Sequence, residues 1–197
     1  MVDLDVSGFR VIVIDDQVTN VEFLTALLER DGFRHVVGVS DPWRALDTVV
    51  AEDADLVMLD VMMPHVDGYE VLRGLRHALP ADRFLPVLVM TADATPDARR
   101  RALELGATDF LTKPVNVLEA TLRIRNLLRT RRLQHACDHL ERALAAAIVL
   151  LASAEAPAEG DAGDGAHDVA RAFRAMAERL GLDEAQVRRL ELAARRH

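Results

Sequence analysis

The sequence predicts an α/β fold, in which a doubly wound parallel sheet of five strands in the order 2-1-3-4-5 is followed by a C-terminal helical extension. Five short apolar runs each precede a longer stretch with helical periodicity, as alternating strands and helices require. The runs are apolar throughout instead of alternating with polar residues, which is typical of strands covered by helices on both faces. Half of the 197 residues are hydrophobic, so the chain can bury such a core.

Strands and helices are expected in alternation from residue 11 onward. The runs that predict strands are VIVI (11–14), HVVGV (35–39), DLVML (55–59), PVLVM (86–90) and DFLT (109–112). Helical patterns follow over about residues 20–30, 43–51, 69–78 and 97–105, and a longer one starts near residue 116. The parallel strands of such units all end at the same edge of the sheet.

Local signals mark where two of these helices start and one stops. Thr19 and Glu22 have the spacing of a capping box, with Thr19 as the N-cap of the first helix. Gly32 follows the last periodic residue of that helix and predicts its end. Thr95 and Pro96 predict the N-cap and first residue of the fourth helix.

The pattern changes beyond residue 129. Apolar residues there follow at spacings of 4, 3, 4, 3 and 4, a heptad seam of under three repeats formed by Leu133, Cys137, Leu140, Leu144, Ala147 and Leu151. A stretch with one Pro, three Gly and several acids comes next and predicts a flexible linker. We therefore expect four parts: the sheet domain at 9–129, an extended linker helix at 130–152, a flexible acidic linker at 153–167 and a small helical segment at 168–197.

Composition narrows the classes of partner and compartment. The net charge of −8 gives no basic field of the kind that nucleic-acid binding needs. The single cysteine, Cys137, excludes internal disulfides and fits a reducing compartment. The first residues carry acids where a secretory signal carries basic residues, and no apolar run reaches the length of a membrane span. We therefore expect a cytoplasmic protein that binds neither nucleic acid nor membrane.

Polar residues gather at the predicted strand ends. Asp15 and Asp16 follow the first strand, Asp60 ends the third, Thr91 ends the fourth and Lys113 ends the fifth. In the predicted strand order these ends meet around the point between the first and third strands, where open α/β sheets bind their ligands. We expect three carboxylates, a hydroxyl and an ammonium to share one acidic cleft.

The charges of this cleft favour a hard divalent cation. Two carboxylates about 4 Å apart repel by roughly 4 kcal/mol at an effective dielectric constant of about 20. Mg²⁺ relieves such repulsion, because it prefers oxygen ligands and binds one or two carboxylates together with a phosphate oxygen. A carboxylate beside the metal can then attack a phosphoryl group and form an acyl phosphate.

Lys113 is the only lysine of the chain, whose other 23 Lys and Arg residues are all arginine. An arginine would carry the same charge on a broad planar fork, whereas lysine brings a compact ammonium on a flexible stem. Survival of one lysine by chance is the alternative explanation. A small site that already holds a metal favours a functional lysine.

The segment from about residue 9 to 129 resembles the receiver domain of two-component response regulators, the CheY-like family with a flavodoxin-like sheet. The similarity is carried by VIVIDD, LVMLDVMMPHVDG, VMTA and FLTKP, which occur in this order and with suitable spacing. The resemblance implies a phosphoprotein that accepts a phosphoryl group from a sensor histidine kinase, a phosphotransfer protein or a small phosphodonor. It also implies that the Lys113–Pro114 peptide bond is cis.

The resemblance further implies a role for each matched residue. Asp60 would be the phosphoacceptor and form an aspartyl phosphate, while Thr91 and Lys113 would contact the phosphoryl group. Asp15, Asp16, Asp60 and the backbone carbonyl of Met62 would hold Mg²⁺. Thr91 and Phe110 would form the conformational switch. From the residues alone, Asp15 and Asp16 are also consistent with turn residues, and Phe110 with a core aromatic.

The stretch GAHDVARAFRAMAERLGLDEAQVRRLELAARRH resembles the start of the HD-GYP domain, a metal-dependent cyclic di-GMP phosphodiesterase. His167 and His197 would match two of its histidines, but the later metal ligands have no counterpart here, and two histidines do not build a metal site. We therefore expect no enzyme beyond phosphoryl acceptance and self-dephosphorylation on Asp60. The alternative is a fragment of a receiver-linked phosphodiesterase, inactive as it stands.

Two accounts of the C-terminal part remain open: a truncated helical stub, or an output module that associates through the seam of Leu133 to Leu151. Both favour a homo-oligomer such as a dimer, because exposed apolar surface tends to be buried by association.

Overall fold

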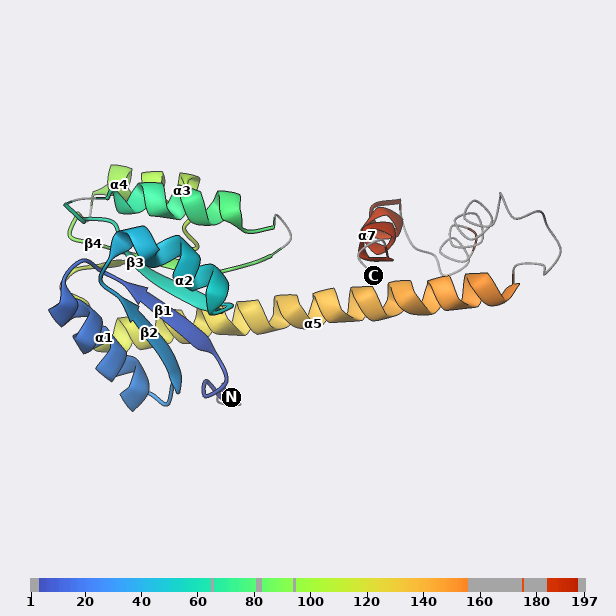
Figure 1. Cartoon of the computed structure of the whole chain (residues 1–197), viewed down its shortest axis with the longest axis horizontal. Coiled ribbons are helices and arrows are strands. Elements are labelled where there is room, and N and C mark those ends of the chain that lie inside the picture. Colours follow the sequence, from blue (N-terminus) through green and yellow to red (C-terminus); the bar gives the residue numbers. More distant parts are fainter. Residues whose placement is uncertain are drawn as a thin grey trace. The chain divides into compact units, whose positions relative to one another are not determined.

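The structure is a computed structural model that describes residues 4–64, 66–80, 83–93, 95–155, 175 and 184–194. Its five parallel strands are β1 (Arg10–Ile14), β2 (His35–Val39), β3 (Leu56–Asp60), β4 (Val87–Thr91) and β5 (Asp109–Thr112). They pair in the order β2-β1-β3-β4-β5, as predicted (Figure 1). Each predicted strand is present within one residue of its expected limits.

The helices also follow the predicted alternation. Their bounds are α1 (Val18–Arg30), the short 3-10 helix η1 (Pro42–Arg44), α2 (Ala45–Ala51), α3 (Gly68–Ala78), α4 (Pro96–Glu104), α5 (Val117–Glu155) and α7 (Glu184–Ala194). Two compact units divide the chain, residues 1–132 and residues 133–197. The first unit contains the whole sheet and the first turns of α5.

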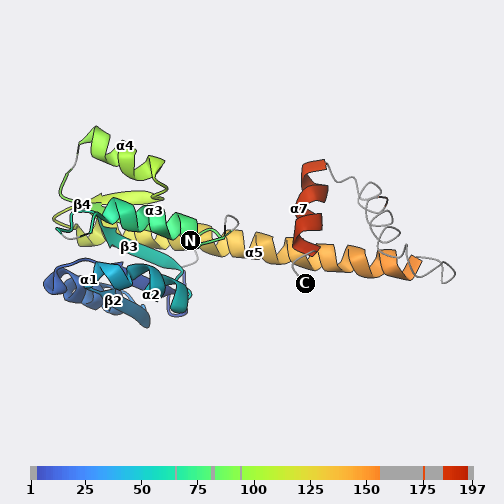
Figure 2. The ribbon, with the colours of Figure 1, turned by 45° about the horizontal axis from the view of Figure 1, so that its top comes forward.

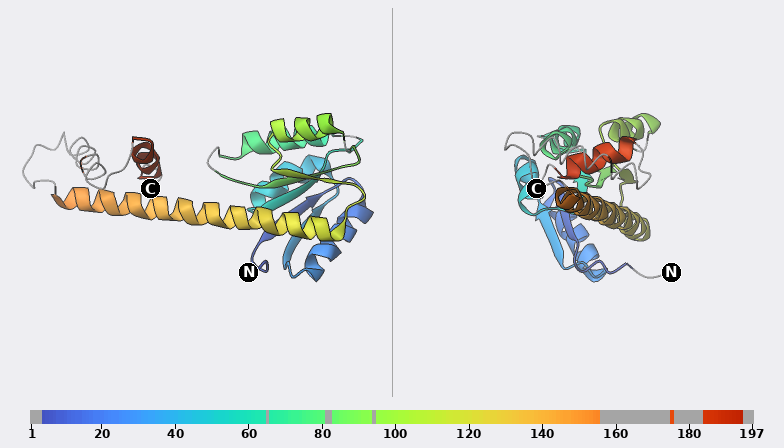
Figure 3. Two further views of the ribbon diagram at one scale, coloured as in Figure 1. Left: turned by 180° about the vertical axis from the view of Figure 1, so that it is seen from behind. Right: turned by 90° about the vertical axis from the view of Figure 1, so that its right-hand side faces the viewer.

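Helices cover both faces of the sheet. Side chains of α1 and of the first part of α5 pack with Val11 and Val13 of β1 on one face. Side chains of α2, α3 and α4 pack with Ile12 and Ile14 on the other face. Figure 3 shows the start of α5 on the side of the sheet away from α3 and α4. The alternation of inward residues along one strand therefore supplies two cores at once.

Burial explains which strands are apolar throughout. β3 and β4 lie inside the sheet and are buried at every position, whereas in the edge strand β2 only Val39 is buried. Figure 2 shows α1 and α2 beside β2, and α4 above β4. The central strands thus end at a rigid edge, which suits them to position side chains of a site.

The predicted capping box of α1 is wrong. α1 begins at Val18, its N-cap is Gln17, and no side chain caps it. The Asp15 carboxylate explains the early start, because it accepts hydrogen bonds from the Gln17 backbone N–H and the Asn20 side chain and folds the chain into a turn.

Two other helix signals are confirmed. Gly32 follows α1 with a φ of 99°, a left-handed conformation that favours glycine. Thr95 caps α4 by accepting a hydrogen bond from the backbone N–H of Ala98, and Pro96 is the first residue of that helix. The fourth helix is therefore positioned by its sequence at the end of β4.

In the second unit, α5 continues without a break to Glu155, so residues 153–155 of the predicted linker are helical. The seam residues Leu133, Leu140 and Leu144 are exposed. Of the small helical segment predicted at 168–197, the structure describes residue 175 and α7, and both are helical. The rest of the predicted linker lies outside the described residues, as do His167 and His197. The predicted limits of the four parts stay predictions. No helix among the described residues combines the length and hydropathy that a membrane span requires.

Candidate functional site

The predicted polar residues meet at the carboxyl edge of the sheet. Asp15 follows β1, Asp60 and Thr91 are the last residues of β3 and β4, and Lys113 follows β5. Asp15, Asp60 and Thr91 are 0%, 1% and 3% exposed, so the site is built into the end of the core. Because neighbouring parallel strands end at the same edge of the sheet, Asp15 and Lys113 lie close together although they are far apart in the chain.

Lys113 bridges two carboxylates of the cluster. Its Nζ lies 2.6 Å from Oδ2 of Asp60 and 2.8 Å from Oδ2 of Asp15 and donates a hydrogen bond to each. Burial by itself lowers the pKa of Lys113, but the hydrogen bonds to the two acids together outweigh burial and raise it above its usual value. The ammonium therefore stays charged at neutral pH.

Asp15 is surrounded by donors. Its Oδ1 accepts a hydrogen bond of 3.0 Å from the backbone N–H of Gln17, and the Asn20 side-chain amide lies 3.0 Å from Oδ1 and 3.1 Å from Oδ2. Asn20 was not among the residues predicted for the site. A polar residue five positions after Asp15, in the first turn of a helix, is only a weak indication of a contact with that acid.

Asp60 is oriented by its own loop. Its Oδ1 accepts a hydrogen bond of 3.0 Å from the backbone N–H of Met62. Gly68, the first residue of α3, packs directly on the same backbone: a Cβ atom built there would lie under 3.0 Å from the Asp60 carbonyl oxygen and the Val61 Cα. The missing side chain of Gly68 therefore lets α3 approach the strand end.

Thr91 and Phe110 occupy β4 and β5 beside the acids. The hydroxyl oxygen of Thr91 accepts a hydrogen bond of 3.0 Å from the backbone N–H of Asp93, and its carbonyl accepts one of 2.8 Å from the Lys113 N–H. Phe110 is half-buried, and the Arg99 guanidinium stacks on its ring at 3.8 Å. The ring is thus held by a cation–π contact, which sequence analysis did not anticipate.

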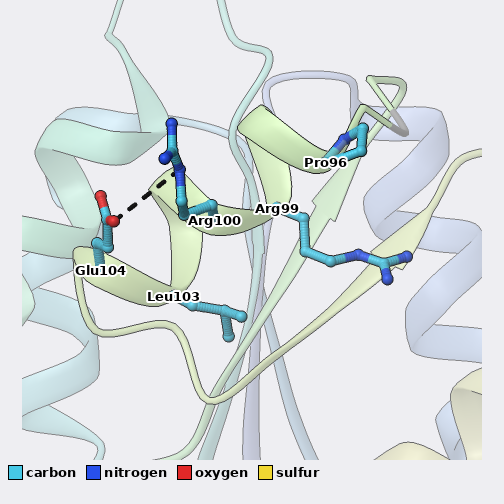
Figure 4. Close-up of a pocket in the computed structure, with 5 residues that line it drawn as sticks. All are labelled: Pro96, Arg99, Arg100, Leu103 and Glu104. Atoms are coloured by element: carbon cyan, nitrogen blue, oxygen red, sulfur yellow. Dashed lines mark ion pairs between the residues drawn. The ribbon is translucent and has the colours of Figure 1, made fainter.

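A pocket of about 370 Å³ lies on α4 (Figure 4). It is lined by Pro96, Arg99, Arg100, Leu103 and Glu104. Arg99 is the residue that stacks on Phe110, and Arg100 lies 4.0 Å from Glu104. Arg99 therefore belongs both to the pocket and to the contact with Phe110.

The donor set fits a hard divalent cation. Asp15, Asp16 and Asp60 each offer a carboxylate oxygen, and these atoms all lie within 4.8 Å of one another. Oδ1 of Asp16 is buried and has no hydrogen-bond partner in the described part of the chain. A buried carboxylate oxygen without a partner is costly, so a cation at this position would satisfy it.

The Lys113–Pro114 peptide bond is cis, as expected.

Comparisons with known proteins agree with this geometry. Residues 11–125 match the response regulator receiver domain. The chain is 34% identical over 208 residues to the cyclic di-GMP phosphodiesterase response regulator RpfG of Xanthomonas campestris, covering 96% of this chain and 54% of RpfG. It is 38% identical over 120 residues to the alkaline phosphatase synthesis transcriptional regulatory protein PhoP of Bacillus subtilis, covering 61% of this chain and 48% of PhoP.

A solved structure shares the fold of the same region. The chemotaxis protein CheY4 of Vibrio cholerae is 27% identical with a TM-score of 0.52, over 58% of this chain and 96% of that one. The chain spans about half the length of the curated relatives RpfG and PhoP. More than half of its residues match a single domain family. The chain belongs to the response regulator receiver domain family.

Proposed function

We propose that Asp60 is the phosphoacceptor of this response regulator and that it works with Mg²⁺. The observation that carries the proposal is a cluster of three carboxylates at one strand edge, in which Asp15 and Asp60 are buried, Asp16 is partly buried, and the Lys113 ammonium contacts Asp15 and Asp60. Asp15, Asp16, Asp60 and the Met62 carbonyl would hold the cation, which when bound neutralises charge on the phosphoryl oxygens. The unpaired Oδ1 of Asp16 supports this assignment.

In the proposed reaction, a carboxylate oxygen of Asp60 attacks phosphorus, and an acyl phosphate forms. The bond from phosphorus to the donor breaks at the same centre, and its electron pair leaves with the donor, a phosphohistidine nitrogen or the oxygen of a small acyl phosphate. Lys113 already lies at Asp60 and would pair with the phosphoryl oxygens, and the Thr91 hydroxyl would donate a hydrogen bond to them. Attack by water on the acyl phosphate would restore Asp60.

The phosphodonor would be a sensor histidine kinase or a phosphotransfer protein. A groove of about 520 Å³ beside the end of β3, lined by Met62, Asp67, Tyr69 and Arg101 among others, offers access near Asp60. Receiver domains act with such partners, and the acidic site requires a donor that brings phosphate to a strand edge. We assign no nucleic acid and no membrane as partners.

Phosphorylation would act as a switch by drawing Thr91 and Phe110 toward the site. Movement of Thr91 breaks its contact with the Asp93 N–H, and movement of Phe110 takes its ring from under Arg99. We further propose that the exposed seam at Leu133, Leu140 and Leu144 joins two copies of the chain, since leucines spaced seven and four residues apart lie on one helix face that fits a second helix.

A second candidate function rests on the alignment with RpfG, which extends beyond the receiver to cover 96% of this chain. In that case the chain is the front part of a receiver-linked cyclic di-GMP phosphodiesterase. Hydrolysis of cyclic di-GMP with added Mn²⁺ or Fe²⁺ tests this candidate. We expect none from these 197 residues, and measurable turnover would overturn that expectation.

The phosphoacceptor assignment is tested with Asp60→Asn. The variant keeps the side-chain shape but removes the nucleophilic carboxylate, so incorporation of acid-labile phosphate from acetyl phosphate and Mg²⁺ should be abolished. Asp97→Asn, at an exposed acid of α4, is the matched control and should label like the parent. Undiminished labelling of Asp60→Asn would refute the assignment.

A further inference from the structure

We propose that Asn20 is a positioning residue for the metal site, which fixes the carboxylate of Asp15 for Mg²⁺. The inference rests on the proposed function and adds a residue outside the acidic triad. Asn20 lies in the first turn of α1, the helix that follows Asp15 directly. Its role is therefore set by the turn that replaces the expected capping box.

The geometry is that of a clamp. The Asn20 Nδ2 contacts both oxygens of Asp15, at 3.0 and 3.1 Å, so a single amide defines the orientation of the carboxylate plane. The acid is fully buried, and in such a setting a hydrogen bond is stronger than in water.

Lys113 also holds Asp15, but it is shared. The same ammonium contacts Asp60, and the proposed reaction draws it toward the phosphoryl group. Among the hydrogen bonds of the described residues, Asn20 then remains the side-chain donor of Asp15, beside the backbone N–H of Gln17. A neutral amide can keep this contact in every state of the site, because it adds no charge that would repel the cation.

A contact with a purely structural role would only close the turn before α1. The two roles differ in the property that each affects. A structural contact affects the stability of the metal-free protein, whereas a positioning contact affects the affinity for Mg²⁺. Outer-shell partners of metal ligands typically change metal affinity by about 10- to 100-fold.

The experiment measures Mg²⁺ binding by isothermal titration calorimetry without any phosphodonor. Asn20→Leu keeps the side-chain volume without donors, and Asn20→Ala removes the volume as well. Both variants should bind Mg²⁺ at least about tenfold more weakly than the parent. Phosphoryl uptake by Asn20→Leu should recover at saturating Mg²⁺, because Asp60 is intact.

Gln17→Ala is the matched control, because it removes an exposed side chain next to Asp15 and keeps the backbone N–H that contacts the acid. It should bind Mg²⁺ like the parent. Parental affinity in both folded Asn20 variants, or weakening that is matched by Gln17→Ala, would overturn the inference. Absence of Mg²⁺ binding in the parent would instead overturn the proposed function.

Discussion

The ammonium of Lys113 lies 2.6 Å from the carboxylate of Asp60, although the two residues are 53 positions apart in the chain. The lysine side chain is 22% exposed and Asp60 is almost fully buried, so the pair sits at the mouth of the site. One compact charge contacts two acids there. If Asp60 accepts a phosphoryl group as proposed, that group would meet a cation already in place.

We predict that Lys113→Arg impairs phosphoryl uptake and the conformational response on the order of tenfold, although it conserves charge. A guanidinium is too broad to contact Oδ2 of both Asp15 and Asp60 from the end of β5. The rate of acyl phosphate formation from acetyl phosphate measures the effect. Arg34→Lys, the reverse exchange at an exposed position, should have none, and normal kinetics of Lys113→Arg would show that shape is irrelevant.

Gly68→Ala should displace the end of β3, which carries the proposed phosphoacceptor Asp60. The new Cβ meets the Asp60 carbonyl oxygen and the Val61 Cα, which are backbone atoms and cannot rotate away. We expect a loss of about 1–3 kcal/mol in the free energy of unfolding and slower phosphoryl uptake. Chemical denaturation and acetyl phosphate labelling measure the two effects.

Gly8→Ala is the control for this substitution, since a Cβ atom there meets nothing within 4 Å. If Gly68→Ala has the same free energy of unfolding and the same phosphoryl uptake as Gly8→Ala, the close packing of α3 on the end of β3 affects neither property.

Tyr69, the only tyrosine, provides a spectroscopic test of the groove beside the site. Burial raises the pKa of its phenol, while the Arg101 cation, which lies over the ring at 4.1 Å, lowers it. The net shift is upward, so the folded state holds this proton more tightly than the unfolded state. Its contribution to stability is complete below about pH 10 and is lost as pH rises through the raised pKa.

Phenolate absorbance should therefore appear at higher pH in the folded protein than in denaturant. Arg101→Met removes the opposing cation and should move the midpoint further upward, whereas Arg100→Met on the exposed side of α4 should not. A lower midpoint in Arg101→Met would contradict the assigned contact.

Arg131→Met should destabilise the sheet domain by about 1–3 kcal/mol, because it leaves the Phe84 carbonyl and the partly buried Asp55 carboxylate without their cation. Arg131 is 3% exposed, donates a hydrogen bond to the Phe84 carbonyl and lies 3.7 Å from Asp55. Thermal unfolding measures the loss. Arg132→Met, at the exposed neighbouring position, should be neutral, and equal melting of the two variants would exclude a special role for Arg131.

Strand order and site could be predicted from the sequence because both depend on local patterns. Asp60 and Thr91 end apolar runs, and parallel strands bring such ends together whatever the loops do. Asn20 could not be predicted, because its contact depends on how tightly the chain turns after Asp15. Phe110 could be placed on a strand, but the Arg99 that stacks on it comes from a separate helix, and no spacing relates the two.

Arg131 connects α5 to the starts of the two central strands of the sheet. β3 ends in Asp60 and is preceded by Asp55, while β4 ends in Thr91 and is preceded by the loop with Phe84. The strands that present the reacting groups at one edge therefore hold the long helix α5 at the opposite edge. A small displacement of β3 or β4 would therefore be passed to α5 through the contacts of Arg131.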